Sequence, residues 1–533
     1  MSTIKADTEN SMDKKSERSN ELATNSLSRE LLTTSLLAAV GTATLVGMHH
    51  GYRQRRQPDA SLQDYVSGVR SQLNLSLLSK PRTAKLKLTN SKLARCRYAY
   101  QQAKVTWQQA YQQPVSTDAI SHHHNVTDFS AIHTTTMLAR PVCWVSGVAS
   151  MPKNIVSAKN DSGDVNHNEH NINNEHSFGV VGIDADRQIV WQTTMPERVH
   201  DIVVQPVVSS QDETSHNNEN RDVVVMGRRP SEKFWVLDTA TGQVKLAIKA
   251  SADRHFYGHA CYSLDGSTLY VTENDTQTLD GKIGIYDAHR DYQKVAEFDS
   301  HGIGPHELIM HPDGDTLVIA NGGIKTEQAS REELNLDSMR PSLVYLNRHD
   351  GTLLEQVTPK HNQMSVRHLA MHNDGTVMVG IQFQGERHIN VPLVLTHKRG
   401  DTDFKPLTMP NNQWQRFHQY IASVAVDSQR NLLCVTTPIG GCAAIYDLNT
   451  RTLVDAVSLP DCAGASIYAN KTANDISNKA HESGFIVSDG QGQLSRLDVS
   501  DLAIPSSNVA ANETIAKDSK RHMMSFDNHL QAL

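Results

Sequence analysis

A histidine followed by an apolar strand and an Asp-Gly turn recurs along the chain, and this repeat most constrains the fold. In three copies the spacing from histidine to aspartate is six, seven and six residues: His259 with Asp265-Gly266, His306 with Asp313-Gly314, and His368 with Asp374-Gly375. Asp-Gly between two apolar runs indicates a hairpin, because glycine adopts positive φ without steric cost. His200 opens the run DIVVQP in the same way, although an insertion replaces the turn.

Short strands continue from Ala139 and group into seven units of about 40–60 residues, each with three or four strands. Helical periodicity is absent after residue 140, which excludes alternating β and α units. The number of repeated units argues against a β-sandwich. We therefore predict an all-β fold, a seven-bladed β-propeller over residues 139–533. The strand near Trp144 or the terminal HMMSFDNHL is expected to complete the first blade and close the ring.

An apolar segment is predicted to precede the propeller. Residues 1–30 are polar and predicted to be disordered. Leu31 to Met48 is an apolar run of 18 residues, long enough for an export signal or a membrane anchor. The LSRELL just before it resembles a twin-arginine signal with Ser28 in place of the first arginine. We expect a periplasmic protein, exported or anchored to the inner membrane through 31–48; a buried core helix is the alternative.

A basic helical extension is predicted over residues 59–113, followed by a linker at 114–137. Lys80 to Gln113 contains eight lysines or arginines and no acidic residue. Attraction to an anionic membrane surface and a solvated helical face are equally consistent with this composition. The net charge of −7 gives no nucleic-acid footprint. Six scattered cysteines without a CxxC motif predict buried free thiols.

The repeated histidines are the candidate metal ligands. In a propeller the first strand of each blade lines the central channel, so these side chains should meet around one axis. Imidazole suits copper, iron, zinc or nickel, and we expect a transition metal, iron or copper, or the edge of a haem. Ser423 and Ala463 or Gly464 stand at this position in two other blades, which leaves an open side for a ligand. The predicted metal ligands are His200, His259, His306 and His368.

A purely structural role is the alternative for these histidines, with the turn aspartates Asp265, Asp313 and Asp374 as their partners. Arginines near three of the histidines suggest an anionic ligand such as a carboxylate or propionate, although salt bridges that fix loops explain them equally well. Polar residues after the second strands of two blades are further candidates. The predicted ligand-binding residues are Arg198, Arg254, Arg367, Glu273, Asn274 and Asn321.

Standard catalytic motifs are missing from the sequence. It contains no HExxH, no GxSxG, no Walker-type GxxxxGK[ST] and no GxGxxG at a strand-to-helix junction. Propeller enzymes assemble their sites from loops of several blades, so catalysis stays open and no reaction type is assigned.

Several long motifs resemble the bacterial family called domain of unknown function 1513. They include RHFYGHACYSLDGSTLYVTEND, GPHELIMHPDGDTLVIANGGI, SVRHLAMHNDGTVMVGIQFQG and the terminal DNHL, and the resemblance covers about Arg140 to Leu530. It implies a seven-bladed propeller exported by the twin-arginine route. It also implies a periplasmic accessory role in iron or haem handling, with imelysin-like and dihaem-peroxidase-like envelope proteins as partners. The basic extension, the His- and Asn-rich insertions and the altered export signal depart from the family pattern.

Three functional hypotheses follow. The first is a periplasmic propeller that binds a metal, haem-like or protein ligand at the histidine-bearing channel mouth and assists iron acquisition. The second is a calcium-dependent propeller enzyme of the lactonase or quinoprotein type, which needs Glu273, Asp275 and Glu307 together in the channel. The third is a protein-docking scaffold without a small ligand.

Overall fold

The chain divides into two units, residues 1–118 and 119–533, and every described residue belongs to the second. The predicted N-terminus (1–30), signal or anchor (31–48) and basic extension (59–113) lie outside the described residues. Among the residues that are described, no helix is long and apolar enough to cross a membrane. The computed structural model describes residues 129, 132–152, 176–207, 221–229, 231–326, 333–469, 483–499 and 515–533.

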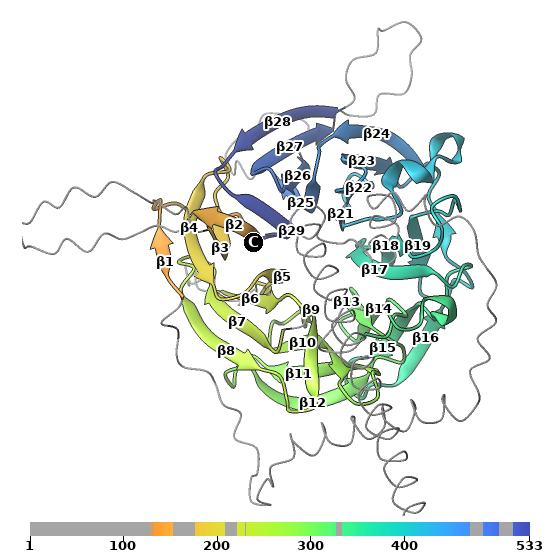
Figure 1. The fold of residues 1–533 in the computed structure, drawn as a ribbon, viewed down its shortest axis with the longest axis horizontal. Coiled ribbons are helices and arrows are strands. Elements are labelled where there is room, and N and C mark those ends of the chain that lie inside the picture. The colour runs from red at the N-terminus through yellow and green to blue at the C-terminus, as the bar shows by residue number, and fades with distance from the viewer. Residues whose placement is uncertain are drawn as a thin grey trace, which may run out of the picture. The chain divides into compact units, whose positions relative to one another are not determined.

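Seven antiparallel sheets follow one another around a central axis (Figure 1). The predicted all-β, seven-bladed propeller is therefore confirmed. Blade 1 contains β1 (Thr134–Thr136), β2 (Trp144–Pro152), β3 (His176–Ile183), β4 (Ile189–Met195) and β29 (Ser525–Ala532). Blade 2 contains β5 (Val199–Val204), β6 (Asp222–Gly227), β7 (Lys233–Asp238) and β8 (Val244–Lys249). Blade 3 contains β9 (Arg254–Tyr262), β10 (Thr268–Asp275), β11 (Gly281–Asp287) and β12 (Gln293–Asp299).

The remaining four blades each take four consecutive strands. Short 3-10 helices η2 (Leu336–Ser338), η3 (Pro410–Asn412) and η4 (Trp414–Phe417) lie in their connections. Blade 4 contains β13 (Pro305–Met310), β14 (Thr316–Asn321), β15 (Ser342–Asn347) and β16 (Leu353–Val357), and blade 5 contains β17 (Met364–Met371), β18 (Thr376–Phe383), β19 (Val394–Lys398) and β20 (Lys405–Pro406). Blade 6 contains β21 (Ser423–Asp427), β22 (Leu432–Thr437), β23 (Cys442–Asp447) and β24 (Thr452–Ser458). Blade 7 contains β25 (Cys462–Ala469), β26 (Ser483–Asp489), β27 (Gln493–Val499) and β28 (Ile515–Arg521).

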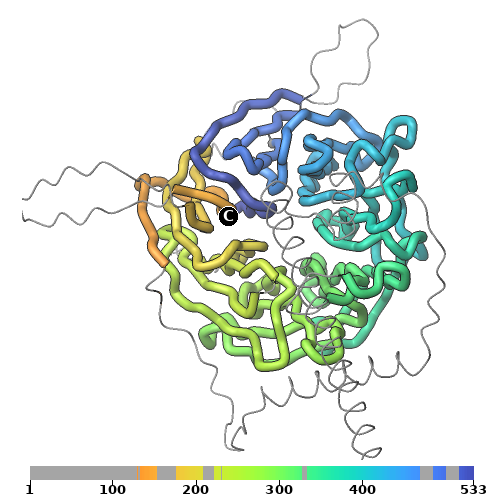
Figure 2. Tube along the Cα trace, viewed as in Figure 1, coloured from red at the N-terminus to blue at the C-terminus, as the bar shows by residue number. Residues whose placement is uncertain are grey.

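Blade 1 closes the ring with strands from both ends of the propeller sequence. β29 pairs with β2, with Leu530 opposite Ser146, so both segments expected to close the ring belong to this blade. In Figure 2 the blue C-terminal segment lies beside the orange start of blade 1. β1 pairs with β4 at the outer edge. The propeller thus begins within the stretch 114–137 that was predicted as a linker, because three threonines extend the sheet.

Large apolar side chains hold neighbouring blades together. Phe234 of blade 2 and Phe256 of blade 3 are fully buried, with ring centroids 5.3 Å apart. Trp191 of blade 1 is also fully buried, and its Nε1 donates to the carbonyl oxygen of Thr239 at 3.0 Å. Burying apolar surface stabilises the fold by roughly 25 cal/mol per Å². This packing fixes the radius at which the inner strands surround the axis.

The Asp-Gly pairs form the predicted tight turns. Gly266, Gly314 and Gly375 all have positive φ, between 67° and 85°. The aspartate before each glycine accepts hydrogen bonds from its own turn; Asp313 Oδ1, for example, accepts the backbone N–H of Thr316 at 2.9 Å. The prediction of buried free thiols is confirmed for four of the cysteines that the structure describes: Cys261, Cys434, Cys442 and Cys462.

Candidate metal centre

The four predicted histidines lie on the inner strands β5, β9, β13 and β17 and meet at the axis. Ring centroids of neighbours are 4.6 Å apart for His200 and His259, and 4.5 Å apart for His259 and His306. His306 and His368 follow at 4.9 Å. The prediction that successive blades bring these imidazoles together is therefore correct in geometry.

A fifth imidazole, His529 on β29, joins them. Its ring centroid lies 4.9 Å from that of His259 and 5.5 Å from that of His200. Sequence reasoning identified the terminal DNHL only as a closing strand, because no Asp-Gly turn follows its histidine. The signal was available, since a closing strand at the inner position must face the same axis. We call His200, His259, His306, His368 and His529 the histidine cluster.

The pairing of each strand that carries a cluster histidine has a register shift, a β-bulge or irregularity, near that histidine. A bulge re-aims side chains and is frequent next to functional sites. Of the two inner strands without a cluster histidine, β21 pairs with β22 without a register shift, whereas β25 has one between Cys462 and Ala465. The shifts fall between Val199 and Ile202, Phe256 and Ala260, Pro305 and Glu307, Val366 and His368, and Phe526 and Leu530.

Gly258 allows the closest approach between two of the strands. Its φ is +108°, a conformation that side chains with a Cβ rarely adopt. A Cβ at this position would overlap Cδ2 of the His200 ring. The Gly258-His259 pair of the sequence therefore reflects the packing of one imidazole against the backbone that carries the next.

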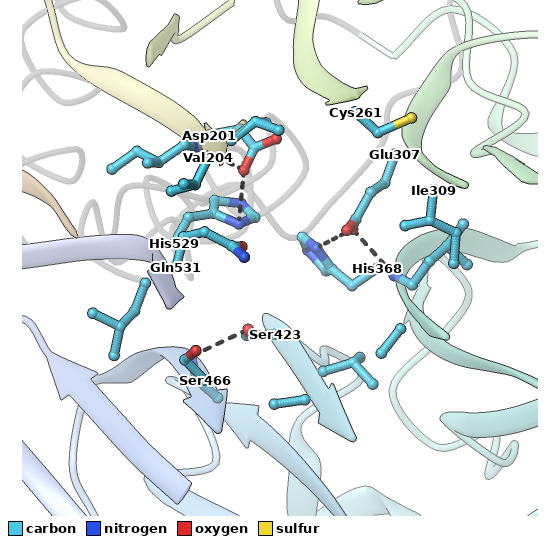
Figure 3. A pocket seen from close by; sticks show the side chains of 18 of the residues that line it. Asp201, Val204, Cys261, Glu307, Ile309, His368, Ser423, Ser466, His529 and Gln531 are labelled. Atoms are coloured by element: carbon cyan, nitrogen blue, oxygen red, sulfur yellow. Dashed lines mark hydrogen bonds and ion pairs between the residues drawn. The ribbon is translucent and has the colours of Figure 1, made fainter. Parts of the chain in front are cut away.

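Two carboxylates face the cluster, Asp201 buried and Glu307 partly buried. Asp201 places Oδ2 3.2 Å from His259 Nδ1 and Oδ1 3.4 Å from His529 Nδ1. Glu307 places Oε2 3.2 Å from His368 Nδ1, and Figure 3 shows these groups beside the cavity. The turn aspartates instead bind their own turns. The expectation that these would be the histidines' partners is therefore wrong, because the turns lie at the far ends of the inner strands.

The opposite ring nitrogens have no partner among the described residues. Nε2 of His259, His368 and His529 is buried without a hydrogen bond, as is Nδ1 of His306. Nδ1 of His259 also has no hydrogen bond, only its ion-pair contact with Asp201. Leaving a buried polar atom unsatisfied costs about 1–3 kcal/mol. An imidazole with a carboxylate behind one nitrogen and a free second nitrogen is the usual arrangement of a metal-binding histidine.

Burial keeps most of these imidazoles neutral. It lowers the pKa of His200, His306 and His368 well below the usual value, and that of His529 to about 3. Burial also opposes charging of His259, but the Asp201 carboxylate outweighs it and raises the pKa of this ring. Neutral rings keep their lone pairs available to a metal ion. Burial raises the pKa of Glu307 to about 8.

The cluster contains two overlapping triads whose ligand atoms lie within 4.8 Å of one another. The outer triad is His200, His259 and His529, and two of its members are partly exposed. The inner triad is His259, His306 and His368, all buried. Either group has the residue types and spacing to hold a metal ion, and His259 belongs to both.

A cavity of about 310 Å³ adjoins the cluster and is lined by the inner strands of all seven blades. Asp201, Glu307, His368 and His529 contribute to its wall. Ser423 of blade 6 lines it as well, with Ala465 and Ser466 in blade 7, so these two blades form the predicted side without histidine. The remaining wall is largely aliphatic and includes Val204, Ile309, Ala370, Val426 and Ile467.

The three predicted arginines occupy different surroundings. Arg198 forms a two-pronged ion pair with Asp527, at 2.5 and 2.9 Å. Arg254 binds Glu297 and Asp275 within blade 3, as the salt-bridge alternative expects. Arg367 instead donates through Nε to Ser365 Oγ at 3.0 Å, and its charge helps burial to lower the pKa of His306 and His368. Of the three, Arg367 is therefore the one that acts on the cluster.

The other predicted ligand-binding residues make structural contacts within their blades. Glu273 is fully buried and accepts hydrogen bonds at 2.7 Å from both Lys294 Nζ and Tyr286 Oη. With its side-chain amide turned to satisfy both groups, Asn274 donates to the carbonyl oxygens of Leu279 and Asp280. Asn321 donates to the carbonyl oxygen of Ser300 at 3.0 Å. The structure does not bring these three side chains to the histidine cluster.

The carboxylates required by the calcium hypothesis are also separated. Glu273 and Asp275 belong to the ion-pair network of blade 3, with Lys294 and Arg254 as partners. Glu307 lies in the channel beside His368. The three therefore do not form one oxygen-rich site of the kind that calcium prefers.

Residues 193–533 match the family model described as protein of unknown function (DUF1513). The chain belongs to the DUF1513 family. The matched part of this DUF1513 protein includes the whole histidine cluster, both carboxylates and Arg367. No match was found among curated proteins. A solved structure of hydrazine synthase from Kuenenia stuttgartiensis is similar over 58% of this chain and 86% of that chain, with 16% sequence identity and a TM-score of 0.42.

Proposed function

We propose that this DUF1513 propeller binds a transition-metal ion at the histidine cluster and serves iron acquisition in the periplasm as an accessory protein. The observation that supports metal binding best is the set of buried ring nitrogens on His259, His368 and His529 that have no hydrogen bond within the described part of the chain. Each of these rings has a carboxylate oxygen 3.2–3.4 Å from its other nitrogen. Such a carboxylate orients the ring and raises its basicity toward a metal.

The spacing of the rings favours a bare ion over a haem. Neighbouring centroids in the cluster are 4.5–6.0 Å apart, which leaves no room for a porphyrin between them. Imidazole nitrogens suit iron and copper among the metals considered. We propose iron before copper, because the family resemblance of the sequence implies a role in iron or haem handling. Arg367 would favour an anionic group beside the bound ion, since its guanidinium charge already acts on two of the rings.

The proposed location and partners rest on the sequence. The apolar run 31–48 and the export-like LSRELL support a periplasmic protein that is exported or held at the inner membrane. Imelysin-like and dihaem-peroxidase-like envelope proteins are the proposed partners, as the family resemblance implies. Fractionation of cells expressing the full chain, with and without residues 31–48, tests the location.

Metal uptake by the purified protein tests the proposed function directly. The chain is stripped with chelator, incubated with Fe(II) without oxygen or with Cu(II), and its metal content is measured. We expect wild type to retain metal and a variant with all five cluster histidines changed to alanine to fall to background. His372→Ala is the matched control, because His372 lies near the cluster strand β17 but is held by Asp374 and Asn431. A wild-type protein that retains no metal would overturn the proposal without any variant.

A further inference from the structure

The sharing of His259 by two triads carries an inference about how the ion is handled. His259 is fully buried and lies at the centre of the cluster, within 4.5–6.0 Å of the other four rings. His200 and His529 of the outer triad are partly exposed, whereas all three rings of the inner triad are buried, although His368 lines the cavity as His529 does. The two ion positions therefore differ in access although they have one ligand in common.

The two positions exclude each other. A ring nitrogen has one lone pair, so one nitrogen of His259 binds one ion at a time. Its Nδ1 lies 3.2 Å from Asp201 Oδ2, and we therefore take Nε2 as the nitrogen that binds the ion in either triad. Two cations held a few ångströms apart in a buried site would also repel each other strongly.

Each position has its own compensating carboxylate. Asp201 faces His259 and His529 of the outer triad, and Glu307 faces His368 of the inner triad. Opposite charge near a buried cation offsets part of its desolvation cost. An acidic side chain therefore lies beside each position, and a cation bound there favours its ionised form.

We propose that the cluster is a two-position relay, in which one ion binds first at the outer triad and then passes to the inner triad while His259 stays bound. This inference rests on the proposed metal binding and adds a path to it. The transfer is a ligand exchange without electron transfer. Metal–nitrogen bonds to His200 and His529 break, and bonds to His306 and His368 form. The inner position, with three buried ligands, retains the ion.

Copper(II) binding to single-histidine variants of the full chain tests the relay. We expect one copper per wild-type chain. Removal of even an outer-shell partner lowers metal affinity by about 10–100-fold. We expect His529→Ala to lose about 10-fold or more through slower copper association, with little change in dissociation. His306→Ala should bind as fast as wild type but release copper at least about 10-fold faster. The two variants should give different Cu(II) EPR spectra, with that of His529→Ala matching wild type.

His259→Ala should abolish binding, because it breaks both triads. The double variant His306→Ala/His529→Ala should match it although His259 is kept, which covers the case that His259→Ala fails to fold. His255→Ala is the matched control: His255 lies on the same strand β9, is fully buried, and also has ring nitrogens without a described hydrogen bond. It should bind copper like wild type.

The outcomes separate the relay from metal binding itself. Absence of copper from wild type would overturn the proposed function and the relay together. If wild type binds one copper per chain but His259→Ala binds copper no more weakly than the other single variants do, the relay alone would be overturned. Two coppers per wild-type chain, or identical EPR spectra for His529→Ala and His306→Ala, would also overturn the relay and leave metal binding standing.

Discussion

At the scale of single residues, the cluster depends on groups that the repeat pattern does not reveal. The four histidines were predictable because each stands at the same place before a strand and a turn. Asp201 and Glu307 follow two of them directly, yet their partners lie on other blades, so spacing along the sequence gave no signal for these pairs. The long arginine side chains likewise reach partners on other strands. Only the folded structure therefore distinguishes Arg367, which acts on the cluster, from Arg198 and Arg254, which form ion pairs.

Asp201 is expected to strengthen metal binding through charge. Asp201→Asn keeps the size of the side chain but removes the carboxylate that faces His259 and His529. We expect affinity for the metal to fall by about 10–100-fold, as for other outer-shell partners, in a competition titration with a chelator. Asp265→Asn, which changes a turn aspartate that binds Ser263 and Ser267, is the control and should leave affinity unchanged. Equal affinity of Asp201→Asn and wild type would contradict the assignment.

Gly258 is expected to tolerate no side chain. Gly258→Ala adds a Cβ at φ +108° that overlaps the His200 ring, and should lower the free energy of unfolding by about 1–3 kcal/mol from strain alone. Gly400→Ala is the matched control, because Gly400 has φ +94° with open space around its Cβ position. Denaturant titration of both variants isolates the clash with His200. If Gly258→Ala loses no more free energy of unfolding than Gly400→Ala does, the predicted clash with His200 is wrong.

At the scale of elements, the bulges of the inner strands and the ion pairs of blade 3 decide where polar groups point. Periodicity predicted the strands, because alternation of apolar residues depends on local pleating. It could not predict the bulges, since a register shift is set by the neighbouring strand. In blade 3 the predicted ligands Arg254 and Glu273 neutralise Glu297 and Lys294, and this network fixes the outer strand.

The blade 3 network should make stability depend on acid. Burial opposes ionisation of Glu297, but hydrogen bonds from Arg254 and Lys294 lower its pKa from 4.5 to about 2. A carboxylate with a depressed pKa stabilises the fold above the unfolded-state pKa, and this contribution is lost as the pH falls from about 4.5 toward 2. Glu297→Gln should therefore unfold more easily than wild type at pH 6, with the difference shrinking toward pH 2. Chemical denaturation across this pH range measures the stability difference between the two proteins. A difference that stays constant with pH would argue against the lowered pKa of Glu297.

At the scale of the whole molecule, seven repeats and the ring closure were predictable because a propeller needs a fixed number of similar units. The fifth histidine was not identified, because blade 1 draws its inner strand from a distant segment that lacks the repeat. The predicted N-terminal segments lie outside the described residues and stay predictions. The cluster itself is a property of the assembled ring, since no blade carries more than one of its imidazoles.

Closure of the ring should support stability and metal binding together. Phe526 on β29 is buried, and Phe526→Ala should lower the free energy of unfolding by about 3–5 kcal/mol. Because the same strand carries His529, the variant should also take up metal more slowly. Met523→Ala is the control, as Met523 is 86% exposed near the same strand. Stability loss without any change in metal uptake would show that His529 is positioned independently of the packing of β29.

The pairing of β29 with blade 1 joins groups that lie far apart in sequence; Ser146 and His529, whose side chain and carbonyl oxygen are hydrogen-bonded, are separated by 383 residues. Contacts of such long range are slow to form, because the entropy of closing the intervening chain is lost before they contribute. A folding intermediate with blades 2 to 5 assembled would already present four imidazoles but not the fifth. Metal supplied at that stage would bypass the more accessible position. We therefore expect a fixed order during maturation, in which the ring of blades closes before the protein takes up its metal ion.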